Sequence, residues 1–172
     1  MTERCWVDGV EGGYVPADDR GLNLSDGAFE TLRVRDGLAA CFSLHQARLE
    51  AGLGCLGFHS PRSLATDALC SAITWLTGAD TSPSGVLRVT VTRGSGPRGY
   101  RAPVNPTVRI IARFSPDQPV VAEPARLGIA PIHFSSQPHF HGAKLLARVE
   151  QVLATSWAQQ QGYDDVVMTS DQ

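Results

Sequence analysis

Lysine is nearly absent from this chain of 172 residues. Of its 15 Lys and Arg side chains only Lys144 is a lysine, and all the others are arginines. Arginine is effectively always protonated, whereas a buried lysine can lose its proton and act as a base or condense with a carbonyl group. If lysine chemistry occurs here, Lys144 is the one candidate. For a lysine without further context, a codon bias toward arginine would be the simpler explanation.

The chain also lacks the marks of several protein classes. Its 4 cysteines lie far apart and form no C-x-x-C pair, which is typical of reduced thiols in a cytosolic protein rather than of a zinc site or a disulfide framework. No apolar run approaches the ~18 residues of a membrane-spanning helix, and the N-terminus has no apolar export segment, so we expect a cytoplasmic protein. A net charge of −2 without a basic face argues against nucleic acid and membranes as partners.

Two periodicities predict an α+β fold. Alternating apolar residues predict strands at 5–7, 28–34, 85–93, 107–114, 126–131 and 165–169. Helical spacing predicts one helix from an N-cap at Ser43 to Leu56, a second from Pro61 to Leu76, and a third over 145–161. Asp8-Gly9 and Asp36-Gly37 are turn signals, and the segments 18–21 and 135–142 are typical of polar loops.

The order of these elements predicts two domains of unequal completeness. We expect an N-terminal α+β domain at 1–115, a proline-containing linker at 116–120, and the start of a second domain at 121–172. The second part contains one helix and two strands, which do not usually form an independent core. The strand near Val166–Met168 is therefore expected to expose an unpaired edge and to promote association.

A glycine motif and a histidine pair do not indicate the sites they first suggest, and Arg48 has two interpretations. Gly94–Gly99 fits G-x-G-x-x-G, but Pro97 prevents the helix that would hold a dinucleotide, so we expect a loop that presents Arg98 and Tyr100. The pair His139 and His141 has no third ligand in register, and we expect no metal site. Arg48 is either paired on the surface with Glu50 or a nearby acid, or in contact with a bound anion.

Several segments, in this order, resemble the fold-type IV pyridoxal-phosphate enzymes, the class IV aminotransferases. They are Trp6-Val7-Asp8-Gly9, the stretch Asp19–Leu32 that is close to D-R-G-(three or four residues)-D-G-x-F-E-T, the H-x-x-R-L match His45–Leu49, and Lys144 at the place of the cofactor lysine. The resemblance implies an α+β fold of that type, with a complete N-terminal α/β sandwich domain and an incomplete second domain. It also implies pyridoxal 5'-phosphate as the cofactor.

Two further stretches resemble the 4-amino-4-deoxychorismate lyases of that family. Arg93–Tyr100 is similar to their R-G-S-G-x-R-G-Y loop, and Gly142–Leu153 to their G-x-K-x-L-x-R-x-E-Q-V-L segment. D-amino-acid aminotransferases usually carry His where this chain has Tyr100. That subgroup and the branched-chain aminotransferases remain alternatives to the lyase, which forms 4-aminobenzoate and pyruvate from aminodeoxychorismate in folate biosynthesis.

The resemblance assigns roles to five side chains. Lys144 would carry the cofactor and shuttle protons, so its pKa would have to fall well below the usual value of about 10.4. Arg48 would contact the cofactor phosphate through its planar fork. Arg98 and Tyr100 would bind a substrate carboxylate, across the interface of a homodimer, and Phe29 would line the substrate site.

The chain departs from the family pattern in two places. It ends at Gln172, before the Glu that pairs with the cofactor ring nitrogen and before the helix whose N-terminus holds the phosphate. Ala147 stands where relatives usually have Asn. A truncated, non-catalytic remnant of the family is therefore the second interpretation.

Overall fold

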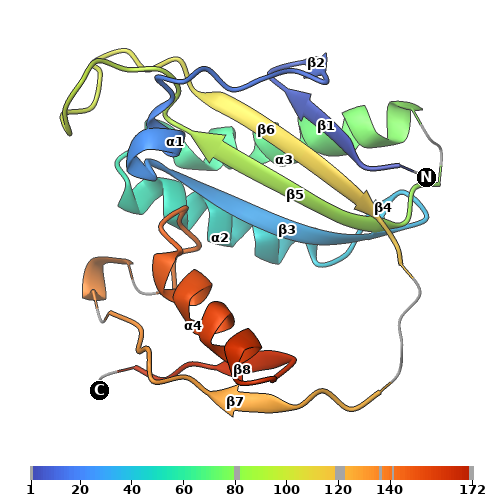
Figure 1. Ribbon diagram of the computed structural model, residues 1–172. Coiled ribbons are helices and arrows are strands. Elements are labelled where there is room, and N and C mark those ends of the chain that lie inside the picture. The colour runs from blue at the N-terminus through green and yellow to red at the C-terminus, as the bar shows by residue number, and fades with distance from the viewer. Residues whose placement is uncertain (1, 80–81, 119–122, 136, 141, 171–172) are drawn as a thin grey trace. The chain divides into compact units, whose positions relative to one another are not determined.

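The computed structural model describes residues 2–79, 82–118, 123–135, 137–140 and 142–170 (Figure 1). The chain divides into two compact units, Met1–Gln118 with Gly142–Leu146, and Pro119–His141 with Ala147–Gln172. Lys144, expected in the second domain, thus belongs to the first unit by its contacts. Of the linker expected at 116–120, Pro116 ends a strand, and residues 119 and 120 lie outside the described residues.

The first unit is a six-stranded antiparallel sheet with two long helices on one face, α2 (Phe42–Cys55) and α3 (Pro61–Ala79) (Figure 1). The strand order is β2-β1-β6-β5-β3-β4. The strands are β1 (Arg4–Val7), β2 (Val10–Glu11), β3 (Gly27–Arg35), β4 (Leu38–Ala39), β5 (Gly85–Thr92) and β6 (Arg109–Pro116). The α+β expectation is confirmed, and so is the expected pairing of β5 with β6.

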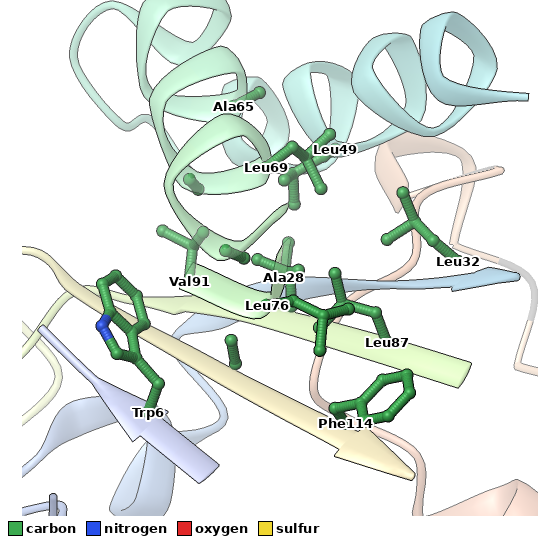
Figure 2. Close-up of a cluster of buried hydrophobic side chains, with 14 of the residues drawn as sticks. Trp6, Ala28, Leu32, Leu49, Ala65, Leu69, Leu76, Leu87, Val91 and Phe114 are labelled. Carbon is green, nitrogen blue, oxygen red and sulfur yellow. The ribbon is translucent and has the colours of Figure 1, made fainter. Parts of the chain in front are cut away.

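The core lies between this sheet and the two helices (Figure 2). Alternation on the strands sends Leu87, Val89 and Val91 of β5 inward, where their side chains are fully buried. Leu69 and Leu76 of α3 meet them from the helix side, also at 0–1% exposure. Each buried leucine contributes about 1.5–3 kcal/mol relative to an exposed one, which fixes the register of the sheet against the helices.

Both predicted hairpin turns are present. Asp8 and Gly9 between β1 and β2 have positive φ angles of 47° and 93°, and Asp36 and Gly37 between β3 and β4 have φ angles of 49° and 79°. Two successive positive φ angles match the right-handed twist of the flanking strands. The Asp-Gly sequences were therefore reliable signals.

Two predictions about local structure are wrong. Ser43 is not the N-cap of α2, because the helix begins at Phe42 and its N-cap is Cys41, two residues earlier, in a left-handed conformation with φ 51°. The segment 18–21 is not a polar surface loop. Asp19 caps the short helix α1 (Arg20–Leu24), and both Asp19 and Arg20 are buried, at 0% and 4% exposure. Arg20 pairs with Asp26 six residues later, whereas Asp19 pairs with the distant Arg109, which local polarity cannot indicate.

The second unit has one helix, α4 (Val149–Gln160), between two short strands that pair in parallel, β7 (Leu127–Ile129) and β8 (Asp165–Val167). A short 3-10 turn η1 (Pro138–Phe140) precedes α4. Gly128 allows Tyr163 and Trp157 to pack against the strand, since a Cβ at this position would lie 2.6 Å from the Tyr163 ring. No helix in the described parts of the chain is both long enough and apolar enough to cross a membrane.

The predicted helix over 145–161 is wrong at its N-terminal end. Leu145 and Leu146 are extended rather than helical, because their backbone pairs with the edge of β3. The apolar residues that seemed to continue the stripe of α4 belong to the other unit. The sequence pattern was compatible with a helix and with an extended segment. Pairing with the edge of β3 favours the extended segment.

Candidate functional site

Lys144 is held beside β3 by backbone hydrogen bonds. Phe29 N–H donates to the Lys144 carbonyl at 3.0 Å, and Leu146 N–H donates to the Gly27 carbonyl at 3.0 Å. Ala28 and Leu145 form an antiparallel bridge between these two bonds. A short extended segment thus lies along the edge of β3 and fixes the backbone that carries the lysine.

This pairing determines which side of the sheet each side chain faces. Directly opposed residues of an antiparallel pair project to the same face, so Leu145 shares the helix-covered face with Ala28. Leu145 indeed packs against the hydrophobic core. Lys144 lies opposite Phe29 on the other face, with its Nζ 5.0 Å from the centre of the Phe29 ring. The amine is half-buried against an aromatic surface.

A second cation lies on the same aromatic ring. The Arg88 guanidinium carbon of β5 is 3.7 Å from the centre of the Phe29 ring, a cation–π distance. Phe29 itself is only 7% exposed. The Phe29 ring lies on the face of the sheet opposite the helices, with the basic side chains of Lys144 and Arg88 over it. Two basic groups on this face suit it to an anionic ligand.

Arg48 is half-exposed and forms an ion pair whose acid is buried. Its Nε and Nη2 donate to Oε1 and Oε2 of Glu30, both at 2.6 Å. The acid is Glu30 rather than Glu50, and its exposed fraction is 0%. The Arg48 side chain as a whole is 44% exposed, so the guanidinium is both anchored and accessible.

His45 completes this cluster. Its Nδ1 is 2.7 Å from Oε2 of Glu30, and since a carboxylate only accepts, this ring nitrogen carries the proton. Burial alone would raise the pKa of Glu30, but the hydrogen bonds from Arg48 and His45 outweigh it and hold that pKa below its ordinary value. The same pairing raises the pKa of Arg48. Both members of the pair are therefore charged at neutral pH.

Arg98 and Tyr100 lie on the loop between β5 and β6, and both side chains are exposed, Tyr100 at 90%. Arg20 holds the backbone of this loop. Its Nη1 donates to the carbonyls of Gly99 at 3.1 Å and Arg101 at 3.3 Å, and its Nη2 donates to that of Tyr100 at 2.9 Å. The loop is fixed at its backbone and presents its side chains outward.

The anchor of that loop is a buried charge cluster. Arg20 Nε donates to Asp26 at 2.8 Å, and Arg93 Nε donates to the same carboxylate at 2.9 Å. Asp19 accepts from Thr92 at 2.8 Å and from Arg109 at 3.1 Å. The buried Asp19 and the partly buried Asp26 thus tie α1 to the ends of β5 and β6, where the loop begins and ends.

Sequence reasoning proposed Lys144, Phe29 and Arg48 as site residues; the structure places Lys144 beside Phe29 and pairs Arg48 with Glu30 of the same strand. It missed Glu30, Arg88 and Arg20. Glu30 could have been found, because it alternates with Ala28 and Leu32 on the apolar face of its strand, where a charge requires a partner. Among the described residues there is no cluster that could hold a metal, and His141 lies outside them.

Comparison with known proteins finds a family and relatives that agree with each other. A profile of the family described as "Amino-transferase class IV" matches residues 27–172. An aminodeoxychorismate lyase from Vibrio harveyi is 30% identical over 155 residues, which make up 87% of this chain and 55% of that protein. The chain therefore spans about half the length of this curated relative.

Solved structures share the fold over nearly the whole chain. The 4-amino-4-deoxychorismate lyase of Pseudomonas aeruginosa matches with a TM-score of 0.80 and 32% identity, over 97% of this chain and 61% of that one. The branched-chain amino acid aminotransferase of Escherichia coli matches with a TM-score of 0.79 and 17% identity, over 99% of this chain and 60% of that one. A PLP-bound hypothetical aminotransferase from Mycobacterium tuberculosis has a TM-score of 0.72 and 22% identity, over 98% of this chain and 62% of that one.

Proposed function

Because this chain belongs to the class IV aminotransferase family, whose members are pyridoxal-phosphate enzymes, we propose that it is a lyase acting on 4-amino-4-deoxychorismate. The reaction breaks a carbon–oxygen bond and yields 4-aminobenzoate and pyruvate. The observation that carries the proposal is the position of Lys144, the only lysine, which is held against Phe29 at the edge of β3. The 30% and 32% identities to two lyases support the lyase assignment.

The residues present fit the cofactor. An aldehyde needs a primary amine, and Lys144 supplies one beside an aromatic ring that limits access of water. A phosphate dianion needs a cation with free donors, and the outer edge of the anchored Arg48 guanidinium supplies one. When bound, pyridoxal phosphate supplies an electron-withdrawing ring that makes proton removal from the substrate easy.

The other residues are assigned to binding and proton transfer. Lys144 Nζ would hold the cofactor and would also move a proton at the substrate. Arg48 orients the phosphate, and Phe29 lines the substrate site. Arg98 and Tyr100, which point outward from the loop fixed by Arg20, bind a substrate carboxylate in a second copy of the chain. In this proposal the enzyme is a cytoplasmic homodimer of folate biosynthesis.

An aminotransferase of the same family is the second candidate. The fold supports it, since the branched-chain enzyme of Escherichia coli has a TM-score of 0.79 with this chain. The loop Arg93–Tyr100 favours the lyase, because it has Tyr100 where D-amino-acid aminotransferases usually carry His. A non-catalytic member of the family is the third candidate, and it would bind the cofactor weakly or not at all.

A direct assay separates these candidates. The chain is incubated with pyridoxal phosphate and 4-amino-4-deoxychorismate, and 4-aminobenzoate is measured by its fluorescence and pyruvate by a coupled dehydrogenase. The lyase proposal predicts equal amounts of both products and none with Lys144→Ala. Transfer of an amino group from D-alanine or a branched-chain amino acid to 2-oxoglutarate, without 4-aminobenzoate, would support the aminotransferase instead.

A further inference from the structure

Glu30 is a fully buried carboxylate on the strand that also carries Phe29. It faces the helices together with Ala28 and Leu32, which are core residues. A charge at such a position is costly unless it is paired and hydrogen-bonded. The first two turns of α2 supply both partners, His45 and Arg48. Glu30 thus joins β3 to α2.

One edge of the Arg48 guanidinium, formed by Nε and Nη2, binds Glu30, and the opposite edge does not. We call the second the outer edge. Two of its five N–H groups, one on Nε and one on Nη2, donate to the two oxygens of Glu30. The bidentate contact fixes the plane of the fork as well as its position. Glu30 does not take up the remaining N–H groups, and the Arg48 side chain as a whole is 44% exposed, so an anion can reach it.

We propose that Glu30 is a positioning residue, which holds the Arg48 guanidinium with its outer edge ready for the phosphate of the cofactor. The inference rests on the proposed function, in which Arg48 is the phosphate contact. Arginine has a long, flexible side chain, and fixing it before the ligand arrives removes an entropic cost from binding. His45 completes the arrangement by donating to the same carboxylate oxygen as Arg48 Nη2.

A purely structural role of this cluster makes a different prediction. If Glu30 only stabilised the fold, its loss would weaken binding of every ligand at Lys144 to the same extent. If it positions Arg48, its loss weakens only ligands that carry a phosphate. Pyridoxal has the same aldehyde and ring as pyridoxal phosphate but no phosphate group, so the ratio of the two affinities reports on Arg48 alone.

The test titrates the full chain with each compound and measures the fraction trapped on Lys144 after borohydride reduction. Wild-type protein is expected to bind pyridoxal phosphate much more tightly than pyridoxal. In Glu30→Gln this ratio should fall by about tenfold, as expected for a lost charge-assisted contact, while the affinity for pyridoxal stays the same. Glu50→Gln, on the same helix as Arg48, is the control and should leave the ratio unchanged.

If Glu30→Gln does not fold, a second variant tests the role of the Arg48 fork in binding the phosphate. Arg48→Lys keeps the positive charge at an exposed position but cannot bind Glu30 and an anion with one planar fork, so it should lower the same ratio. An unchanged ratio in folded Glu30→Gln overturns the inference while leaving the proposed function intact. An unchanged ratio in Arg48→Lys overturns the inference together with the role of Arg48 as the phosphate contact, but not the lyase activity. Absence of trapping on Lys144 in the wild-type protein overturns both.

Discussion

At the scale of single residues, the charge state of Glu30 makes the stability of the chain depend on pH. Its pKa in the folded protein lies below the ordinary value of 4.5, because hydrogen bonds from Arg48 and His45 outweigh the effect of burial. A depressed acid pKa stabilises the fold above the ordinary pKa, and this contribution is lost as the pH falls through the folded value. Glu30 therefore stabilises the chain at neutral pH but not in strong acid.

We expect the free energy of unfolding of the wild-type chain to fall as the pH drops below 4.5. The exposed acids Glu3 and Glu11 also have lowered pKa values, since both bind arginines, so the wild-type curve alone does not isolate Glu30. Urea denaturation of wild type and Glu30→Gln across this range separates them. The Gln variant should be less stable at neutral pH and show the smaller pH dependence; parallel curves would contradict the assignment.

Gly27 is a second residue whose identity the structure explains. A Cβ at this position would collide with the Val91 carbonyl and would lie 2.8 Å from Cδ1 of Leu146, two residues after Lys144. Gly27→Ala should therefore destabilise the chain by about 1–3 kcal/mol in chemical denaturation, as overpacked sites do. Gly78→Ala is the control, since a Cβ there meets nothing within 4 Å and alanine favours a helix. Equal effects of the two substitutions would refute the steric argument.

Some of these residues could be predicted from the sequence and others could not. Lys144 stood out because the chain has no other lysine, and Arg48 because its surroundings match a short pattern. The partner of Arg48 was uncertain, because spacing along a helix indicates neighbours such as Glu50 but not an acid on a distant strand. Alternation along its strand marks Glu30 as a buried charge in need of a partner, but the loop carbonyls that Arg20 binds are found only in the folded structure.

At the scale of elements, strong alternation and turn residues predicted most of the sheet. The strands β3, β5 and β6 agree with prediction to within about two residues at each end, the usual uncertainty of such boundaries. The segment 145–146 failed because two adjacent leucines fit a helix face and an extended edge equally well. Its pairing with β3 is a tertiary interaction that outweighs local propensity.

The loop between β5 and β6 provides a test at this scale. Arg20 binds three successive backbone carbonyls in it, at Gly99, Tyr100 and Arg101. Arg20→Gln removes these bonds while leaving Asp26 paired with Arg93. We expect trypsin to cleave after Arg98 and Arg101 several-fold faster in this variant under native conditions, because cleavage requires local opening of the loop.

Arg33→Gln is the matched control for this proteolysis experiment. Arg33 forms an exposed ion pair with Asp117 and contributes little to the order of the chain. Its removal should leave the cleavage rate of the loop unchanged. Equal rates in wild type and Arg20→Gln, measured by mass spectrometry of the first fragments, would show that Arg20 does not hold the loop.

At the scale of the whole molecule, the second unit leaves many apolar side chains exposed. They lie on β7, α4 and β8 and include Leu127, Ile129, Val149, Val152, Leu153 and Val167, all at least 45% exposed. Exposed apolar clusters and short open strands promote association. We expect the chain to self-associate as its concentration rises, as judged by size-exclusion chromatography with light scattering.

Charged substitutions on α4 test whether its exposed apolar side chains cause this self-association. Val152→Lys with Leu153→Glu places charges on two side chains that are 61% and 53% exposed, and the helix should tolerate both. This double variant should shift the chain toward the monomer. A wild-type chain that stays monomeric over a hundredfold range of concentration would contradict the expectation.

The central claim is that Lys144 is the amine that holds pyridoxal phosphate. The chain has only one other primary amine, its N-terminus, so chemical trapping can be assigned without ambiguity. The decisive measurement is borohydride reduction in the presence of the cofactor, followed by peptide mass mapping. The account predicts one saturable pyridoxyl group on the peptide that contains Lys144, absent from Lys144→Ala. Incorporation only at the N-terminus, or none at all, would contradict it.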